Sequence, residues 1–151
     1  MKLIVKTLSE TAQIPVYGSG AAAGLDVRSD EDCVIEAGER KCINTGICIE
    51  WIKNDENDEN PEDFYLHLCP RSGLAVRQGI QIGGGIIDSD YRGELKVIIF
   101  NSGNEEFIIS RGDRIVQAIL TRIIRFSEIV LQSELSETQR NQSGFGSSGI
   151  K

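Results

Sequence analysis

Gly83-Gly84-Gly85-Ile86-Ile87-Asp88-Ser89-Asp90-Tyr91-Arg92-Gly93-Glu94-Leu95 joins two apolar runs through a turn, and it predicts a β-hairpin. The arms are residues 79–87 and 94–101, because the second run is rich in the β-branched and aromatic residues that favour strands. Three consecutive glycines permit positive φ and a close approach of the backbone to another group. Such a hairpin can present main-chain N–H and C=O groups to the flat edge of a ligand. An ordinary glycine-rich turn with solvated acids is the alternative that these residue types leave open.

Length, composition and charge limit the kinds of protein that this chain can be. The chain has 151 residues and 16 glycines, which favours one domain of many short strands joined by tight turns. Its formal net charge of -7 argues against stable nucleic-acid binding. An anionic ligand therefore requires local basic side chains or a divalent cation.

The cysteines and the N-terminus indicate a compartment. Four cysteines show no C-x-x-C pair and no zinc-like spacing, which favours free thiols in a reducing environment. The only apolar run near the N-terminus, Leu3-Ile4-Val5, is too short for a signal peptide, and no segment approaches a membrane span. The sequence predicts a soluble intracellular protein of the cytoplasm or nucleus that does not bind membranes.

Further strands are expected from alternating or β-branched sequence at residues 2–8, 33–36, 41–51, 64–69 and 106–109. Residues 53–63 carry six acids and are expected to form a solvated surface loop. In residues 115–124 the apolar positions fall at helical spacing, whereas the isoleucine content favours a strand. Periodicity does not decide between the two.

Two polar stretches suggest anion binding. Residues 70–79 predict a short helical turn capped by Ser72, whose first N–H groups and the neighbouring Arg71 suit a phosphate. A capped turn with a surface arginine is the alternative. Residues 133–151 are too polar to bury themselves, so they are expected to be mobile in the free protein. Phe145, five residues after Arg140, predicts a lid that orders when it stacks on a base.

Five blocks resemble, in order, the motifs of the trimeric dUTPases (deoxyuridine 5′-triphosphate nucleotidohydrolases). They are Ala-Gly-Leu-Asp-Val-Arg-Ser (23–29), Pro-Arg-Ser-Gly-Leu-Ala (70–75), Gly-Ile-Ile-Asp-Ser-Asp-Tyr-Arg-Gly-Glu (85–94), Arg-Gly-Asp-Arg-Ile-Val-Gln (111–117) and residues 140–149. The resemblance implies an all-β fold, a compact jelly-roll-like distorted β-barrel with at most one short helix, over residues 1–132. It also implies a flexible arm, residues 133–151, that closes over an active site, a homotrimer with sites at the subunit interfaces, and a strand at residues 115–124.

The activity implied by the resemblance is that of a dUTP diphosphatase, which cleaves dUTP at the α-phosphate to dUMP and pyrophosphate. Such an enzyme keeps uracil out of DNA and supplies dUMP for dTMP synthesis. Asp88 matches the general base that activates a water. Mg²⁺ is the implied cofactor, held through water by Asp26.

The resemblance also implies the substrate contacts. The uracil edge is bound by main-chain groups, and the ring of Tyr91 packs on the deoxyribose, where a ribose 2′-hydroxyl would collide. The remaining expected contacts are, for uracil, Gly85, Ile86, Ile87 and Lys96; for the phosphates, Arg71, Ser72, Gly73, Gln117 and Arg140; and for the closing arm, Phe145 stacked on uracil and Gly146 at its bend.

Three features depart from the family pattern: the glycines before residue 86, Asn141-Gln142 after Arg140, and the acidic loop, which resembles an insertion.

Two other functions are alternatives to dUTP hydrolysis. A dCTP deaminase-like enzyme needs a glutamate on the returning strand, and residues 95–100 contain no acid. A nucleotide-responsive regulatory protein of the same fold is the second, and the intact Asp88 and Tyr91 argue against lost activity.

Overall fold

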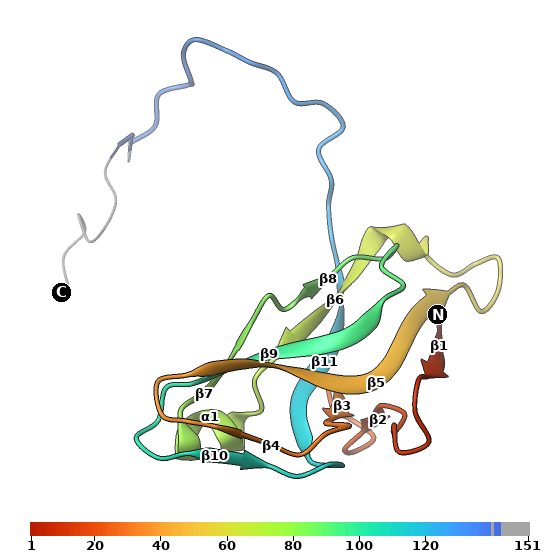
Figure 1. The fold of residues 1–151 in the computed structure, drawn as a ribbon. Coiled ribbons are helices and arrows are strands. Elements are labelled where there is room, and N and C mark those ends of the chain that lie inside the picture. The colour runs from red at the N-terminus through yellow and green to blue at the C-terminus, as the bar shows by residue number, and fades with distance from the viewer. Residues whose placement is uncertain (140, 143–151) are drawn as a thin grey trace.

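The structure, a computed structural model, describes residues 1–139 and 141–142, and it is built mainly of antiparallel strands (Figure 1). In chain order the elements are β1 (Lys2–Thr7), β2 (Val16–Tyr17), β3 (Leu25–Arg28), β4 (Cys33–Ile35), β5 (Arg40–Ile52), a 3₁₀ turn η1 (Pro61–Asp63), β6 (Phe64–Cys69), α1 (Ser72–Gln78), β7 (Ile80–Gly83), β8 (Ile86–Ile87), β9 (Glu94–Asn101), β10 (Phe107–Ile109) and β11 (Arg114–Arg122). A mostly β fold with one short α-helix is therefore confirmed.

Three sheets surround the core. Their strand orders are β1-β5-β9-β7, β2-β3-β11-β6-β8 and β10-β4. On β9 the residues Leu95, Val97 and Ile99 are buried and alternate with exposed positions. Burial of each such side chain stabilises the fold by about 1.5–3 kcal/mol, so this alternation fixes the register of β9. Within the described residues the sheets do not close into the expected barrel, because the edge strands of one large sheet, β1 and β7, do not pair with those of the other, β2 and β8.

Residues 115–122 lie in β11, between β3 and β6 at the centre of the five-stranded sheet. The strand expectation is confirmed and the helical spacing is misleading. The pairing of β11 with β3 shifts register between Arg114 and Val116, and Ile115 and Val116 are both buried. This irregularity breaks the period of two, which explains why the apolar residues resemble a helical pattern.

The predicted continuous hairpin is wrong beyond Gly83. β7 pairs with β9, from Ile80 opposite Asn101 to Gly83 opposite Ile98. β8 instead pairs with β6 in the other sheet. Gly84 has φ +59, which permits the change of direction between them. A Cβ on Gly83 would lie 2.5 Å from the Phe100 ring, so the glycines also serve close packing.

The expected cap of α1 is also wrong. The N-cap residue is Arg71, in extended conformation, and no side chain caps the helix; Ser72 is its first residue. The Arg71 guanidinium donates to the carbonyl of Arg114 across 2.9 Å, which holds this residue outside the helix. The helix ends at Gly79 with φ 67, whose N–H bonds the last turn.

The acidic loop before β6 is exposed, as predicted, and contacts near its middle and its C-terminal end tie it to the body. The N-terminal ammonium of Met1 lies 2.5 Å from Asp58 Oδ2, and the Trp51 indole N–H donates to the carbonyl of Pro61 across 2.9 Å. The ammonium lowers the pKa of Asp58.

A second anchor holds residues 9–12. Ser9 and Thr11 donate hydrogen bonds to Asp30 across 2.5 and 2.6 Å. These bonds, the one from Ser9 first, hold the pKa of Asp30 below its ordinary value. Both anchors place carboxylates where ionisation favours the folded chain.

The four cysteines are free thiols, as predicted, and burial raises the pKa of Cys33. Among the residues that the structure describes, no helix has the length and the apolar character needed to span a membrane.

The chain leaves the sheets after β11, and residues 123–139 extend away from them without helix or strand (Figure 1). This segment exposes large apolar side chains: Ile124, Phe126, Ile129 and Leu131 are each 90% or more exposed. Apolar side chains exposed this close together in one segment are unusual for a surface that faces water alone.

Candidate active site

The change of sheet between β7 and β8 opens a pocket. β7 pairs with β9 only from Ile98 onward, so the first half of β9 has no partner on that side. The pocket between this free edge and β8 holds about 170 Å³ and is lined by Ile86, Ile87, Asp88, Tyr91, Glu94 and Lys96. This is below the ~300–1,000 Å³ of a drug-sized ligand site, so it suits a single ring.

The main chain of Lys96 is directed into this pocket. Its partner on β5 is Asn44, but the Asn44 N–H donates to Glu31 and the Asn44 C=O accepts from Asp30. Since residues opposite each other in an antiparallel pair alternate between bonded and non-bonded, the Lys96 N–H and C=O turn away from β5. They form one donor and one acceptor side by side on the free edge of β9.

The same alternation directs the main chain of Ile86 toward the gap. The Gly85 carbonyl accepts from the Leu68 N–H across 2.7 Å, so Gly85 faces β6. The next residue, Ile86, pairs with His67 without exchanging hydrogen bonds and faces the opposite way. The side chain of Ile86 is 66% exposed.

The turn between β8 and β9 is held by its own side chains. The Tyr91 hydroxyl donates to the carbonyl of Glu94 across 3.0 Å, and its ring lies over Gly93, where a Cβ would come within 2.4 Å of the hydroxyl. Arg92 donates to the Ser89 carbonyl across 2.7 Å. Asp88 is exposed beside the pocket, so its carboxylate is free to accept a proton from water.

A second group of charged residues lies on β3, β11 and the turn before α1. Asp26 is buried, and Arg71 Nε and Arg114 Nη1 each lie 3.2 Å from one of its oxygens. The Arg71 contact is not aligned as a hydrogen bond, so Asp26 Oδ1 has no hydrogen-bond partner among the described residues. Two guanidinium groups against one carboxylate leave net positive charge here.

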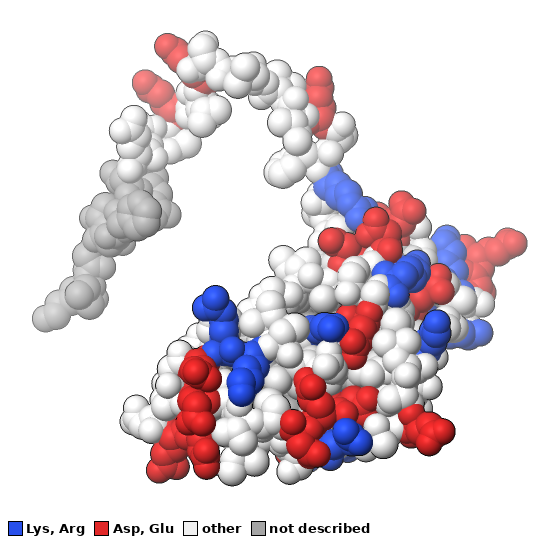
Figure 2. Space-filling model, viewed as in Figure 1, with Lys and Arg blue, Asp and Glu red and all other residues white. Residues whose placement is uncertain are grey.

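An open pocket of about 480 Å³ adjoins this cluster, and Arg28, Arg71 and Arg114 line it. Arg28 is fixed by donating to the Gly112 carbonyl across 2.5 Å. The pocket is lined by these three arginines and by one acid, Asp113, so its net positive charge suits an anion in a chain of net charge -7. On the described part of the face in Figure 2, basic side chains lie among acidic ones.

The structure brings some predicted residues together and separates others. Gln117 on β11 lies opposite both Asp26 and Cys69, while Ser72 and Gly73 begin α1. Of the residues expected to bind uracil and sugar, all but Gly85 line the other pocket, whereas of the described residues expected to bind the phosphates only Arg71 lines the arginine pocket. Neither pocket contains members of both sets. Arg140, Phe145 and Gly146 lie outside the described residues.

Sequence reasoning did not single out Arg28 or Arg114. Both lie inside matched blocks, but only the pairing of β3 with β11, which sets Arg114 opposite Arg28, puts them at one pocket. Thr45, whose hydroxyl donates to the carbonyl of Leu95, was also missed. No local pattern around Thr45 signals this contact, which joins strands far apart in the sequence.

Comparisons with known proteins find similar sequences and a similar fold. The sequence model of the dUTPase family matches residues 10–149. A "Deoxyuridine 5'-triphosphate nucleotidohydrolase" of Paramecium bursaria Chlorella virus 1 is 45% identical over 98% of both chains, and one of Nautilia profundicola is 44% identical over 99% of both. Among solved structures, the Staphylococcus bacteriophage 80alpha dUTPase G164S mutant with dUpNHpp matches with a TM-score of 0.82, at 26% identity over 99% of both chains.

Proposed function

The chain belongs to the dUTPase family, and on that premise we propose how its two pockets divide the work of a dUTP nucleotidohydrolase. The enzyme converts dUTP to dUMP and pyrophosphate. The observation that carries the proposed division is the free edge of β9, where the Lys96 main chain offers a donor and an acceptor to a pocket of ring size.

Base recognition follows from these main-chain groups. The uracil edge carries carbonyl acceptors on both sides of an N–H donor, and the Lys96 C=O and N–H, with groups of residues 85–87, match it. Cytosine reverses donor and acceptor at two adjacent positions, and the thymine methyl needs space that so small a pocket lacks. Each mismatch costs about 1–3 kcal/mol in transition-state binding.

Sugar recognition is assigned to Tyr91. Its ring is held by the hydrogen bond to the Glu94 carbonyl and by contact with Gly93, so moving the ring away costs free energy. A deoxyribose packs against such a ring, whereas a ribose places its 2′-hydroxyl against it. The enzyme therefore prefers dUTP to UTP.

The phosphates are assigned to the arginine pocket, with Arg71, Ser72, Gly73 and Gln117. Mg²⁺, when bound, neutralises charge on the three phosphates. The described residues contain no group of three side chains suited to direct metal binding. Asp26 Oδ1, which accepts no hydrogen bond among the described residues, does fit an ion held through water, because it can accept a hydrogen bond from a metal-bound water.

The hydrolytic step is assigned to Asp88. Its carboxylate accepts a proton as a water oxygen forms a bond to the α-phosphorus, in line with the departing oxygen. The bond from the α-phosphorus to the bridging oxygen breaks, and pyrophosphate leaves. The exposure of Asp88 at the edge of the base pocket supports this assignment.

A homotrimer, in the jelly-roll-like arrangement of the family, is the assembly we propose. Since one chain keeps the base pocket and the arginine pocket apart, a complete site takes one pocket from each of two neighbours. The exposed apolar residues after β11 support this, because covering each one contributes about 1.5–3 kcal/mol. Light scattering should give three times the chain mass, and a monomer at micromolar concentration would contradict the proposal.

The arm, residues 133–151 beyond a domain of residues 1–132, is proposed to close the site, with Arg140 at the γ-phosphate, Phe145 on uracil and Gly146 at the bend. A chain truncated after residue 139 should unfold at the same temperature as the full chain but lose most hydrolysis. Full activity without these residues would remove the arm from the mechanism.

Pyrophosphate release from dUTP, dCTP, dTTP and UTP, with and without Mg²⁺, tests the function as a whole. We expect release from dUTP with Mg²⁺ and little from the others. Release of ammonia from dCTP would favour the deaminase. The lack of an acid in residues 95–100 argues against that activity. Tight dUTP binding without turnover would favour a regulatory protein.

A further inference from the structure

An irregularity in β5 lies opposite the start of β9. The pairing runs from Arg40 opposite Phe100 to Asn44 opposite Lys96 and resumes with Cys48 opposite Glu94, so β5 carries extra residues here. Gly46, with φ +66, sits within the irregularity. These residues do not continue the ladder, which frees their polar groups for other partners.

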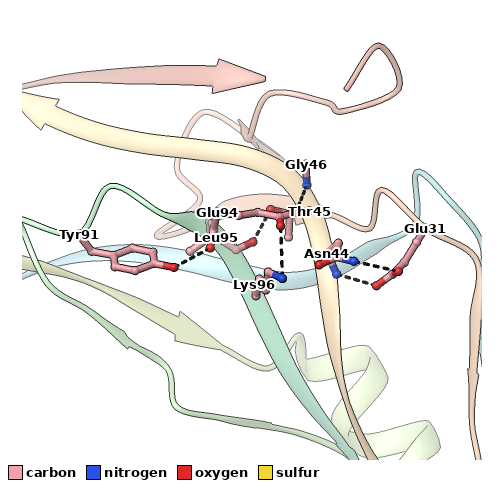
Figure 3. Close-up of polar contacts among 8 residues, drawn as sticks. All are labelled: Glu31, Asn44, Thr45, Gly46, Tyr91, Glu94, Leu95 and Lys96. Carbon is pink, nitrogen blue, oxygen red and sulfur yellow. Dashed lines mark hydrogen bonds and ion pairs between the residues drawn. The ribbon is translucent and has the colours of Figure 1, made fainter. Parts of the chain in front are cut away.

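Two of those groups reach across to β9 (Figure 3). The Thr45 hydroxyl donates to the carbonyl of Leu95, and the Gly46 N–H donates to Glu94 Oε1 across 3.0 Å. Thr45 is only 1% exposed, so its hydroxyl has no alternative partner in solvent. The second oxygen of Glu94 lies 3.5 Å from Lys96 Nζ.

Thr45 is itself held in place. The residue before it, Asn44, is fixed by Glu31, whose carboxylate accepts from the Asn44 N–H at 2.7 Å and from its side-chain amide at 3.1 Å (Figure 3). The Asn44 carbonyl accepts from the Asp30 N–H across 2.9 Å. The contacts of Asn44 with Asp30 and Glu31, in a separate part of the chain, therefore set the direction of the Thr45 hydroxyl.

The carbonyl that Thr45 holds belongs to the same peptide unit as the Lys96 N–H. In a planar trans peptide these two groups point in opposite directions. With the Leu95 carbonyl drawn toward β5, the Lys96 N–H must point into the base pocket. A hydrogen bond to the carbonyl also polarises the peptide, which makes its N–H a stronger donor.

We propose that Thr45 is a positioning residue for base recognition: its hydroxyl orients and polarises the Leu95–Lys96 peptide, whose N–H binds a carbonyl oxygen of the pyrimidine. The inference deepens the function proposed above and rests on it. Thr45 touches no substrate. It acts through the Leu95–Lys96 peptide of β9, which contacts the base.

The test compares Thr45→Val, which removes the hydroxyl at nearly constant volume, with Thr45→Ser, which keeps it. Loss of the bond leaves a buried carbonyl unpaired, so Thr45→Val should raise the KM for dUTP and the Kd for dUMP about tenfold, while Thr45→Ser stays within about twofold of the parent. Inhibition by pyrophosphate, which binds at the arginine pocket, should not change. A merely structural role would weaken both ligands together.

Wild-type affinity for dUMP in a folded Thr45→Val protein would overturn the inference, as would equal loss of dUMP and pyrophosphate binding. If Thr45→Val fails to fold, the unaltered protein still decides: its Lys96 amide proton should shift downfield when dUMP is added in an NMR titration, and an unmoved signal overturns the inference. Absence of dUTP turnover in the unaltered protein is a separate result, which defeats the proposed function instead.

Discussion

Replacing Gly85 by alanine tests the split between β7 and β8. An added Cβ would lie 2.6 Å from the carbonyl oxygen of Leu68 and 3.6 Å from the Leu68 Cβ. Leu68 is buried in β6, where it cannot move aside. β8 must therefore shift by several tenths of an ångström, which strains the 2.7 Å hydrogen bond from the Leu68 N–H to the Gly85 carbonyl.

The size of the effect follows from two terms. Overpacking against a fixed backbone costs about 1–3 kcal/mol, and weakening one hydrogen bond costs about 0.5–1.5 kcal/mol. Together they destabilise the fold by about 1.5–4.5 kcal/mol, which lowers Tm by roughly 3–18 °C in a chain of this size. Because β8 forms one wall of the base pocket, the KM for dUTP should rise as well.

The assays are thermal unfolding and steady-state pyrophosphate release. Gly20→Ala is the matched control, because a Cβ there meets nothing within 4 Å and should change stability by less than about 0.5 kcal/mol. If Gly85→Ala matched the control in both Tm and KM, the close approach of β8 to β6 and its part in the pocket would be refuted.

Three further changes have defined outcomes. Asp88→Asn should lower kcat by about 100-fold or more while dUTP-analogue affinity persists, because it removes the base and little volume; unchanged turnover by stopped-flow would reject the assignment. Tyr91→Ala should raise kcat/KM for UTP relative to dUTP, and no gain would count against the steric explanation. The depressed pKa of Asp30 means that its carboxylate stabilises the fold above its unfolded pKa of about 4 and loses that effect as pH falls through the folded value, so Asp30→Asn should flatten the acid limb of stability against pH. An unaltered acid limb in denaturant titrations would show that the Ser9 and Thr11 bonds contribute nothing.

Local sequence predicted those elements whose residues report on their own neighbours. The alternation in β9 and the alternating aromatic and aliphatic residues of β6 gave correct strands, because one face of each lies on the core. The acidic loop was predicted from its charge and turn residues. The grouping of Arg71, Asp26 and Gln117 followed from motif order and agrees with the pairing of β3, β11 and β6.

The errors arise where distant residues decide. The glycines at 83–85 predict flexibility but not which sheet the chain joins after them, since that depends on the free edge of β6. Ser72 resembles a cap, yet the contacts of Arg71 with Asp26 and Arg114 set where α1 begins. The irregularity in β5 that places Thr45 behind Leu95 has no signature beyond Gly46.

A crystal structure with a non-hydrolysable dUTP analogue tests the central claim most directly. We predict that the uracil edge lies between β8 and β9, within hydrogen-bonding distance of the Lys96 main chain, with Asp88 of the same subunit beside the α-phosphorus. A base bound elsewhere, with the gap between β8 and β9 still open, would contradict it.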